Sequence, residues 1–147
     1  MEVYSIGFTQ KTAEQFFGIL KRAGIRRLVD VRLNNTSQLA AFAKRDDLSY
    51  FLREICGAEY VHEPLLAPTQ ELLDSIKKSK GPWAEYEAGF LELMRERRVD
   101  ERVERRLLFE LPTVLLCSEP TADCCHRRLV LEYLRERWRD GFEIVHL

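Results

Sequence analysis

Three of the four cysteines fall in the segment CSEPTADCCHRR, residues 117–128, together with one histidine and two arginines. Thiol, imidazole and guanidinium groups at such short spacing suit nucleophilic chemistry, thiol redox chemistry or metal binding. The segment follows the apolar run VLL, which predicts a buried strand, and it leads into a helical pattern. We therefore expect Cys117 at the end of a strand, facing the start of a helix.

That position favours a negative charge on sulfur. The start of a helix has unpaired N–H groups and a partial positive charge, which stabilise a nearby thiolate. His126 and Arg127 stand in or near the first turn of the expected helix and would add positive charge. The segment thus predicts an activated thiol at Cys117 or an anion-binding pocket. Three structural alternatives remain: a buried filler role for Cys117, a surface position for His126, and an ion pair of Arg127 with Glu119 or Asp123.

Metal binding is a further possibility for the same segment. The candidate ligands are Cys117, Cys125 and His126, but their spacing matches no C-x-x-C pattern, and adjacent residues rarely bind one tetrahedral ion. The sequence therefore favours no metal. We expect the four cysteines to be free thiols, catalytic groups or ligands rather than a disulfide framework. A disulfide within the cluster is a further alternative, mainly if the protein comes from a hyperthermophile.

The elements that must position these groups alternate between strands and helices. Apolar runs predict strands at Val3–Ile6, Ile25–Val31, Tyr60–His62, 114–117 and Phe142–His146. Helical patterns cover about 12–23, 46–55, 69–78, 83–109 (in two pieces that meet near Val99-Asp100) and 125–138. Thr12 and Gln15 match a T-x-x-Q capping box at the start of the first helix, and Asp46 or Asp47 is expected to cap the second. This order predicts an α/β fold, namely a single three-layer α/β/α domain over residues 1–147 with a mostly parallel, Rossmann-like sheet of about five strands.

Parallel α/β sheets bind ligands at the carboxyl ends of their strands, where further polar residues are expected to meet. They are Gly7, Asp30, Arg32, His62 and Glu119. Arg32 could bind a phosphate or carboxylate with two hydrogen bonds, or form an ion pair with Asp30 or Glu119. His62 has an unperturbed pKa near 6.5, which suits acid–base chemistry, or it is a satisfied strand-end histidine.

Net charge and the distribution of apolar residues limit the kinds of partner that the protein can bind. A formal net charge of −1 over 147 residues argues against an extended polyanion but permits a local basic groove. The chain has no apolar run of the roughly 18 residues that a membrane span needs, and its start, MEVYSIGF, lacks the regions of a signal peptide. We therefore expect a cytoplasmic protein without a membrane partner. The usual nucleotide-binding glycine loops are absent from the sequence.

Five stretches resemble the DUF488 family, a group of small domains named for their unknown function. They are YSIGF at 4–8, LVDVR at 28–32, YVH at 60–62, WAEY at 83–86 and LLCSEPTADCCHRR at 115–128. The loop LNNTSQLAAFAK resembles a subgroup with an N-N-T-S-Q loop. The resemblance implies a three-layer α/β fold and little biochemistry. The positions that match family motif residues are Gly7, Asp30, Arg32, His62, Cys117, Glu119, Cys125, His126 and Arg127.

The favoured hypothesis is an enzyme acting on a small anionic, phosphate- or nucleotide-like substrate. Cys117 would be nucleophile or redox thiol, His126 or His62 would shuttle protons, and Glu119 would orient one of them. The residues assigned to substrate or anion binding are Gly7, Asp30, Arg32 and Arg127. Two alternatives stay open: a nucleic-acid or nucleotide binding module without catalysis, and a structural thiol or metal site only. The sequence identifies no cofactor.

Overall fold

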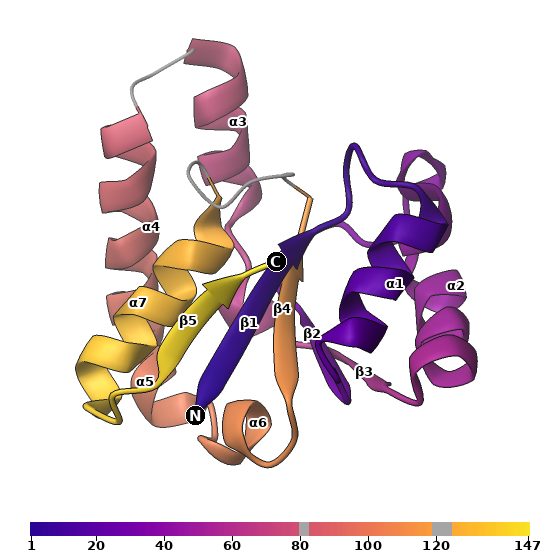
Figure 1. Cartoon of the computed structure of the whole chain (residues 1–147). Helices are drawn as coiled ribbons and strands as arrows, with labels where there is room; N and C mark the ends of the chain where they lie inside the picture. Colours follow the sequence, from indigo (N-terminus) through magenta and orange to yellow (C-terminus); the bar gives the residue numbers. More distant parts are fainter. Residues whose placement is uncertain (80–82, 119–124) are drawn as a thin grey trace.

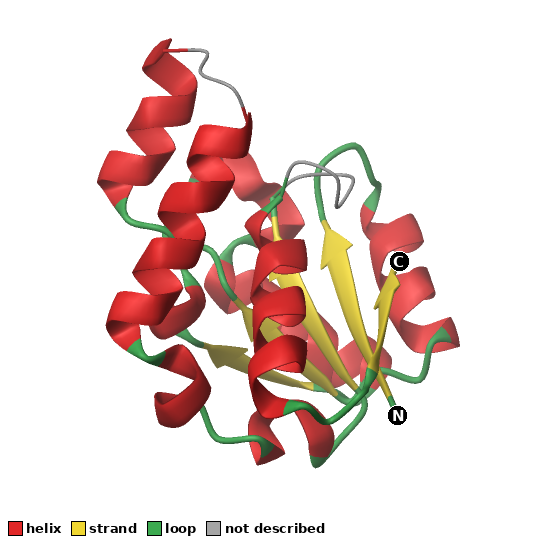
Figure 2. Cartoon of the chain, turned by 90° about the vertical axis from the view of Figure 1, so that its left-hand side faces the viewer, coloured by secondary structure: helices red, strands yellow, loops and turns green. Residues whose placement is uncertain are grey.

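The computed structural model of the chain describes residues 1–79, 83–118 and 125–147. Its strands form one sheet in the order β3-β2-β4-β1-β5, and every pairing among them is parallel (Figure 1). The strands are β1 (Glu2–Gly7), β2 (Arg27–Asp30), β3 (Glu59–His62), β4 (Thr113–Cys117) and β5 (Glu143–His146). Helices cover both faces (Figure 2), so the predicted three-layer α/β/α domain is confirmed.

Each face of the sheet is covered by its own set of helices. One face is covered by α1 (Ala13–Arg22), α2 (Arg45–Phe51) and the π-helical continuation η2 (Leu52–Cys56). The opposite face is covered by α4 (Trp83–Arg97) and α7 (His126–Trp138). The remaining elements are η1 (Gln38–Ala43), η3 (Pro64–Leu66), α3 (Gln70–Ser79), α5 (Val99–Arg102) and α6 (Arg106–Phe109). In Figure 1, α3 and α4 rise together beside the carboxyl edge of the sheet.

Local signals in the sequence explain where several helices begin and end. The backbone N–H of Gln15 donates to Thr12 Oγ1 at 3.1 Å, and that of Thr12 donates to Gln15 Oε1 at 2.9 Å, which completes the predicted capping box. Gly57 ends η2 with φ of 61°, a left-handed conformation that glycine adopts without strain. The start of α2 differs from the prediction, because Lys44 and not an aspartate holds the N-cap position.

Two segments contain more helix than expected. The region 83–109, predicted as two helical pieces, forms three, and the break after α4 falls at Arg98, whose φ is 54°. The polar loop after β2 contains the 3₁₀ helix η1, where Ser37 accepts a hydrogen bond from the N–H of Leu39. Apolar periodicity could not reveal η1, because a short 3₁₀ helix is set by local hydrogen bonds rather than by a buried stripe.

Alternation along the strands divides the core into two halves. Leu28 and Val114 pack against α1 and α2, whereas their neighbours Val29 and Leu115 pack on the side of α4 and α7. Burying each such side chain stabilises the fold by roughly 1.5–3 kcal/mol. This alternation also decides on which side of the sheet a polar residue at a strand end lies. In the part of the chain described, no helix is long and apolar enough to span a membrane.

Candidate functional site

Strand register brings the predicted site residues to one edge of the sheet. Gly7 of β1 lies opposite Cys117 of β4, and Asp30 of β2 lies opposite His62 of β3. Within the described residues they form two clusters, because the strands that carry them point their last side chains to opposite faces. The predicted site residue Glu119 lies outside the described residues.

The first group, the cysteine cluster, comprises Ser5, Cys117, Cys125, His126 and Arg127 and faces α7. Cys117 and Cys125 form a disulfide across a sequence separation of 8, and their exposed fractions are 1% and 2%. Cys125 is the N-cap residue of α7 and has extended backbone, which directs its side chain towards the end of β4. The expectation of free thiols is therefore wrong for this pair and correct for Cys56.

Arg127 links the disulfide to the centre of the sheet. Its side chain is fully buried. Nη1 donates to Cys117 Sγ at 3.1 Å, and Nε donates to Ser5 Oγ at 3.1 Å. The Ser5 hydroxyl also contacts Nδ1 of His146 on the neighbouring strand β5. A continuous row of polar groups thus runs from the partly exposed edge strand to the sulfur of Cys117.

His126 is held rigidly in a neutral form. Its Nε2 lies 2.8 Å from the backbone oxygen of Val31, and its ring packs 5.4 Å from the ring of Phe90. The pKa of His126 is lowered to about 4, mainly by burial and also by the charge of Arg127, although the hydrogen bond with Val31 and the charge of Asp30 raise it. Because the carbonyl accepts a proton from Nε2, Nδ1 retains its lone pair at neutral pH.

Among the described residues, Cys117, Cys125 and His126 each offer a donor atom, and these three atoms lie within 4.8 Å of one another. This is the ligand set that the sequence suggested for a metal. The objection from adjacency weakens in the fold, since Cys125 is extended and His126 begins the helix.

Positive charge gathers beside this cluster. Lys11, in the loop after β1, has a pKa lowered first by burial and then by the charge of Arg127. The two cations therefore lie close enough to repel each other. The same loop is tied to β4, because Thr9 Oγ1 donates to the backbone oxygen of Ser118 at 2.6 Å. A cavity of about 340 Å³ adjoins it and is lined by Thr9, Gln10, Lys11, Gln15, Ile19 and Arg22.

The second group, the aspartate cluster, comprises Asp30, Arg32, Asn35, Tyr60 and His62. Arg32 donates from Nε to Oδ1 and from Nη2 to Oδ2 of Asp30, both at 2.8 Å. The backbone N–H of Arg32 also donates to Oδ1, at 3.0 Å, and the Tyr60 hydroxyl donates to Oδ2 at 2.6 Å. Burial and the hydrogen bond to Asp30 both raise the pKa of Tyr60. The predicted alternative of an Asp30–Arg32 ion pair is what the structure contains.

Three further contacts hold this cluster at the sheet edge. Asn35 donates to the Tyr60 hydroxyl at 3.1 Å, and His62 Nε2 lies 3.0 Å from the backbone oxygen of Arg32. The guanidinium carbon of Arg32 lies 5.3 Å from the centre of the Phe8 ring. Of the side-chain nitrogens of Arg32, Nη1 alone has no hydrogen-bond partner within the described part of the chain. Most of the binding capacity of Arg32 is therefore committed to Asp30.

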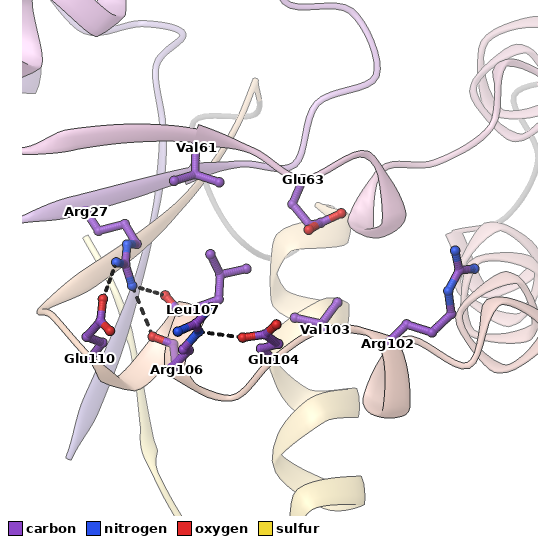
Figure 3. A pocket seen from close by; sticks show the side chains of 9 residues that line it. All are labelled: Arg27, Val61, Glu63, Arg102, Val103, Glu104, Arg106, Leu107 and Glu110. Atoms are coloured by element: carbon purple, nitrogen blue, oxygen red, sulfur yellow. Dashed lines mark hydrogen bonds and ion pairs between the residues drawn. The ribbon is translucent and has the colours of Figure 1, made fainter.

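A separate cavity of about 460 Å³ lies around Arg27, the first residue of β2 (Figure 3). Arg27 donates to Glu110 at 2.7 Å and to the backbone oxygens of Arg106 and Leu107, both at 3.0 Å. Arg27 lies at the opposite end of β2 from Asp30. We read it as a structural clamp between β2 and α6, because its guanidinium is saturated by these groups and by Glu59.

A comparison with known protein families identifies the family of this chain. Residues 12–134 match the family described as "Domain of unknown function DUF488", and the chain belongs to that family. The family prediction is thereby confirmed, whereas the N-N-T-S-Q subgroup stays a prediction. Neither the curated proteins nor the solved structures gave a match. The family carries no assigned function, so the chemistry of the site has to be argued from its geometry.

Sequence reasoning missed Ser5, Lys11, Tyr60 and His146. Ser5 could have been found, since a hydroxyl inside a buried apolar strand requires a hydrogen-bond partner. Tyr60 precedes His62 by two positions, so the two share a face of β3. Lys11 and His146 carried no signal, because nothing in the sequence shows which loop or edge strand lies next to Arg127.

Proposed function

We propose that the chain is an enzyme that acts on a small anionic substrate at the cysteine cluster. The main supporting observation is the fully buried guanidinium of Arg127, which donates to Cys117 Sγ at 3.1 Å. Lys11 lies close enough for the charge of Arg127 to lower its pKa. A bound anion beside the sulfur would be attracted by both positive charges, because opposite charges interact strongly in a site of low dielectric.

Each residue of the cluster has a role in this proposal. Cys117 is the nucleophile or redox thiol once the disulfide is reduced, and Arg127 and Lys11 hold the anion. The neutral ring of His126 acts as a hydrogen-bond partner of the reacting groups, since a pKa of about 4 makes it a poor proton shuttle at pH 7. Gly7, opposite Cys117, lets the backbone approach the site without a side chain.

The aspartate cluster supports this site rather than taking part in it. Asp30, Arg32 and Tyr60 fix the end of β2, and the carbonyl of the next residue, Val31, orients His126. We therefore propose that Asp30 and Arg32 position the site and that His62 secures the backbone of Arg32. The orienting role predicted for Glu119 stays a prediction.

A second candidate function is structural. The near-complete burial of Cys117 and Cys125 favours a staple that joins the end of β4 to the start of α7. A buried disulfide of this kind would resist reagents and need no anion. The binding-module alternative would instead show as salt-sensitive binding of an oligonucleotide.

Alkylation of the reduced protein separates these functions. We expect iodoacetamide at neutral pH to label Cys117 faster than Cys56, because burial raises the pKa of Cys56 while Arg127 stabilises the Cys117 thiolate. Phosphate or sulfate should slow the labelling of Cys117 and leave that of Cys56 unchanged.

The variant Arg127→Gln should remove both the rapid labelling and the anion protection. Arg128→Gln is the matched control, since Arg128 stands next on the same helix and pairs with Glu132 at 2.9 Å. Labelling of Cys117 no faster than of Cys56, together with no effect of phosphate or sulfate, would support the staple and refute the enzyme.

A further inference from the structure

We infer that Cys117, Cys125 and His126 form a Zn²⁺ site when the disulfide is reduced. The three donors come from two elements, the end of β4 and the first turn of α7, and lie within 4.8 Å of one another. The inference does not rest on the proposed catalysis, because zinc binding requires only these donors and their surroundings.

The distances suit a tetrahedral ion. Zinc binds thiolate sulfur at about 2.3 Å and imidazole nitrogen at about 2.0–2.1 Å, which places neighbouring donor atoms about 3.4–3.8 Å apart. The three donors lie within 4.8 Å of one another, and the two sulfurs, which are bonded to each other in the disulfide, would move apart to that spacing after reduction. Two thiolates and an imidazole are ligands of the softness that zinc prefers over magnesium or calcium. Three protein ligands also leave the fourth position for water or a small anion, as in catalytic zinc sites.

The surroundings of the donors match those of metal ligands. A histidine that binds a metal usually donates its other ring N–H to a carbonyl or carboxylate, which fixes the tautomer. His126 contacts the backbone oxygen of Val31 in this way through Nε2, so that Nδ1 is left to bind the ion. Arg127 supplies the corresponding contact to a thiolate ligand, through the hydrogen bond from Nη1 to Cys117 Sγ.

Reduction opens the site. An external dithiol transfers two electrons and two protons to the Cys117–Cys125 bond, which leaves two protein thiols and an oxidised dithiol. Zn²⁺ then replaces the two thiol protons, which are released to solvent. In the oxidised chain Cys117 and Cys125 have no thiolates to offer. Metal binding is therefore switched by the redox state of this one bond, and a bound ion would withhold the Cys117 sulfur from other electrophiles.

Cobalt provides the direct test, since Co²⁺ occupies zinc sites and absorbs light. After reduction under inert gas and removal of metal with a chelator, we expect one Co²⁺ per chain. The spectrum should show a thiolate-to-metal charge-transfer band and the visible bands of tetrahedral cobalt, and Zn²⁺ should abolish both. The oxidised protein should give no charge-transfer band. This readout uses the unaltered chain, so it does not depend on the folding of any variant.

Variants assign the ligands. Cys117→Ser and Cys125→Ser should each remove the charge-transfer contribution of one thiolate and weaken Zn²⁺ binding at least 100-fold, and His126→Gln should weaken it 10-fold or more. Cys56→Ser is the matched control and should bind normally, because Cys56 donates to the backbone oxygen of Phe17 on the α1 side of the sheet.

Two results would overturn the zinc site. One is the absence of a charge-transfer band in reduced wild-type protein, and the other is a band that keeps its full intensity in Cys117→Ser. Neither result touches the proposed function, which depends on anion protection of Cys117 in metal-free protein. Conversely, zinc binding without anion protection would leave the metal site standing and remove the enzyme.

Discussion

The two clusters at the sheet edge use buried charge in different ways. In the aspartate cluster the carboxylate of Asp30 accepts four hydrogen bonds, from two side-chain nitrogens and the backbone N–H of Arg32 and from Tyr60. In the cysteine cluster, Arg127 instead donates to a hydroxyl and to a sulfur. The Asp30–Arg32 pair has no redox chemistry, whereas a sulfur changes charge with its redox state. The first arrangement holds a fixed geometry, and the second can respond to chemistry.

The largest expected effect lies in the aspartate cluster. Asp30→Asn should lower the free energy of unfolding by about 3–5 kcal/mol, because it leaves the buried Arg32 cation without its charged partner. Urea denaturation measures this loss. The control Asp46→Asn affects an exposed pair with Arg45 and should change stability by no more than about 0.5 kcal/mol. Similar losses in the two variants would show that the buried pair contributes nothing special.

Reduction of the disulfide should have the next largest effect. A loop closed across a separation of 8 residues restricts the unfolded chain by about 2.5 kcal/mol, and that stabilisation should disappear when a dithiol is added. Unfolding in metal-free buffer, with and without reductant, gives the difference. Cys56→Ser should keep it, and Cys117→Ser should abolish it. An unchanged midpoint in wild-type protein would mean that the bond is not present in solution.

Removal of the Tyr60 hydroxyl tests how much one hydrogen bond to Asp30 contributes to stability. Tyr60→Phe should cost about 1–2 kcal/mol, because it removes one hydrogen bond to the buried carboxylate of Asp30. Thermal and urea unfolding report the change. Tyr50→Phe is the control, since Tyr50 is 52% exposed. A loss no larger than that of the control would indicate that the remaining donors satisfy Asp30 alone.

The Arg27 clamp should give the smallest effect, and one that depends on pH. Arg27 lowers the pKa of Glu110 by a hydrogen bond and by its charge, so the pair stabilises the fold above the ordinary glutamate pKa. This contribution disappears as the pH falls through the lowered pKa. Glu110→Gln should therefore be slightly less stable than wild type at pH 7 and equal to it in strong acid. A difference that grew towards low pH would contradict this assignment.

Much of the fold was predictable because local patterns of apolar and capping residues indicate strands and helices. The predicted strands and all the principal helices are present, and the capping box of Thr12 with Gln15 forms as expected. The strand order was not predicted, since it depends on pairings between segments far apart in the chain. The helix break expected near Val99-Asp100 falls at Arg98, whereas the further break between α5 and α6 was not predicted.

The candidate site was predictable as a set of residues but not as a geometry. Motif spacing and strand ends pointed to Cys117, His126, Arg127, Asp30 and Arg32, which do lie at one edge. Their division between two faces depends on the phase of each strand, and a shift by one residue would reverse it. The disulfide likewise depends on the distance between the end of β4 and the start of α7, which sequence spacing does not fix.

The place of β1 has a consequence for synthesis of the protein. Although β1 precedes the other described strands along the chain, it lies between β4 and β5, which follow β2 and β3. A chain leaving the ribosome therefore exposes both edges of β1 until β4 and β5 have emerged. A chain that ended before β5 would leave one edge of β1 uncovered, and this edge could pair with other chains. We expect such fragments to aggregate and to be retained by chaperones.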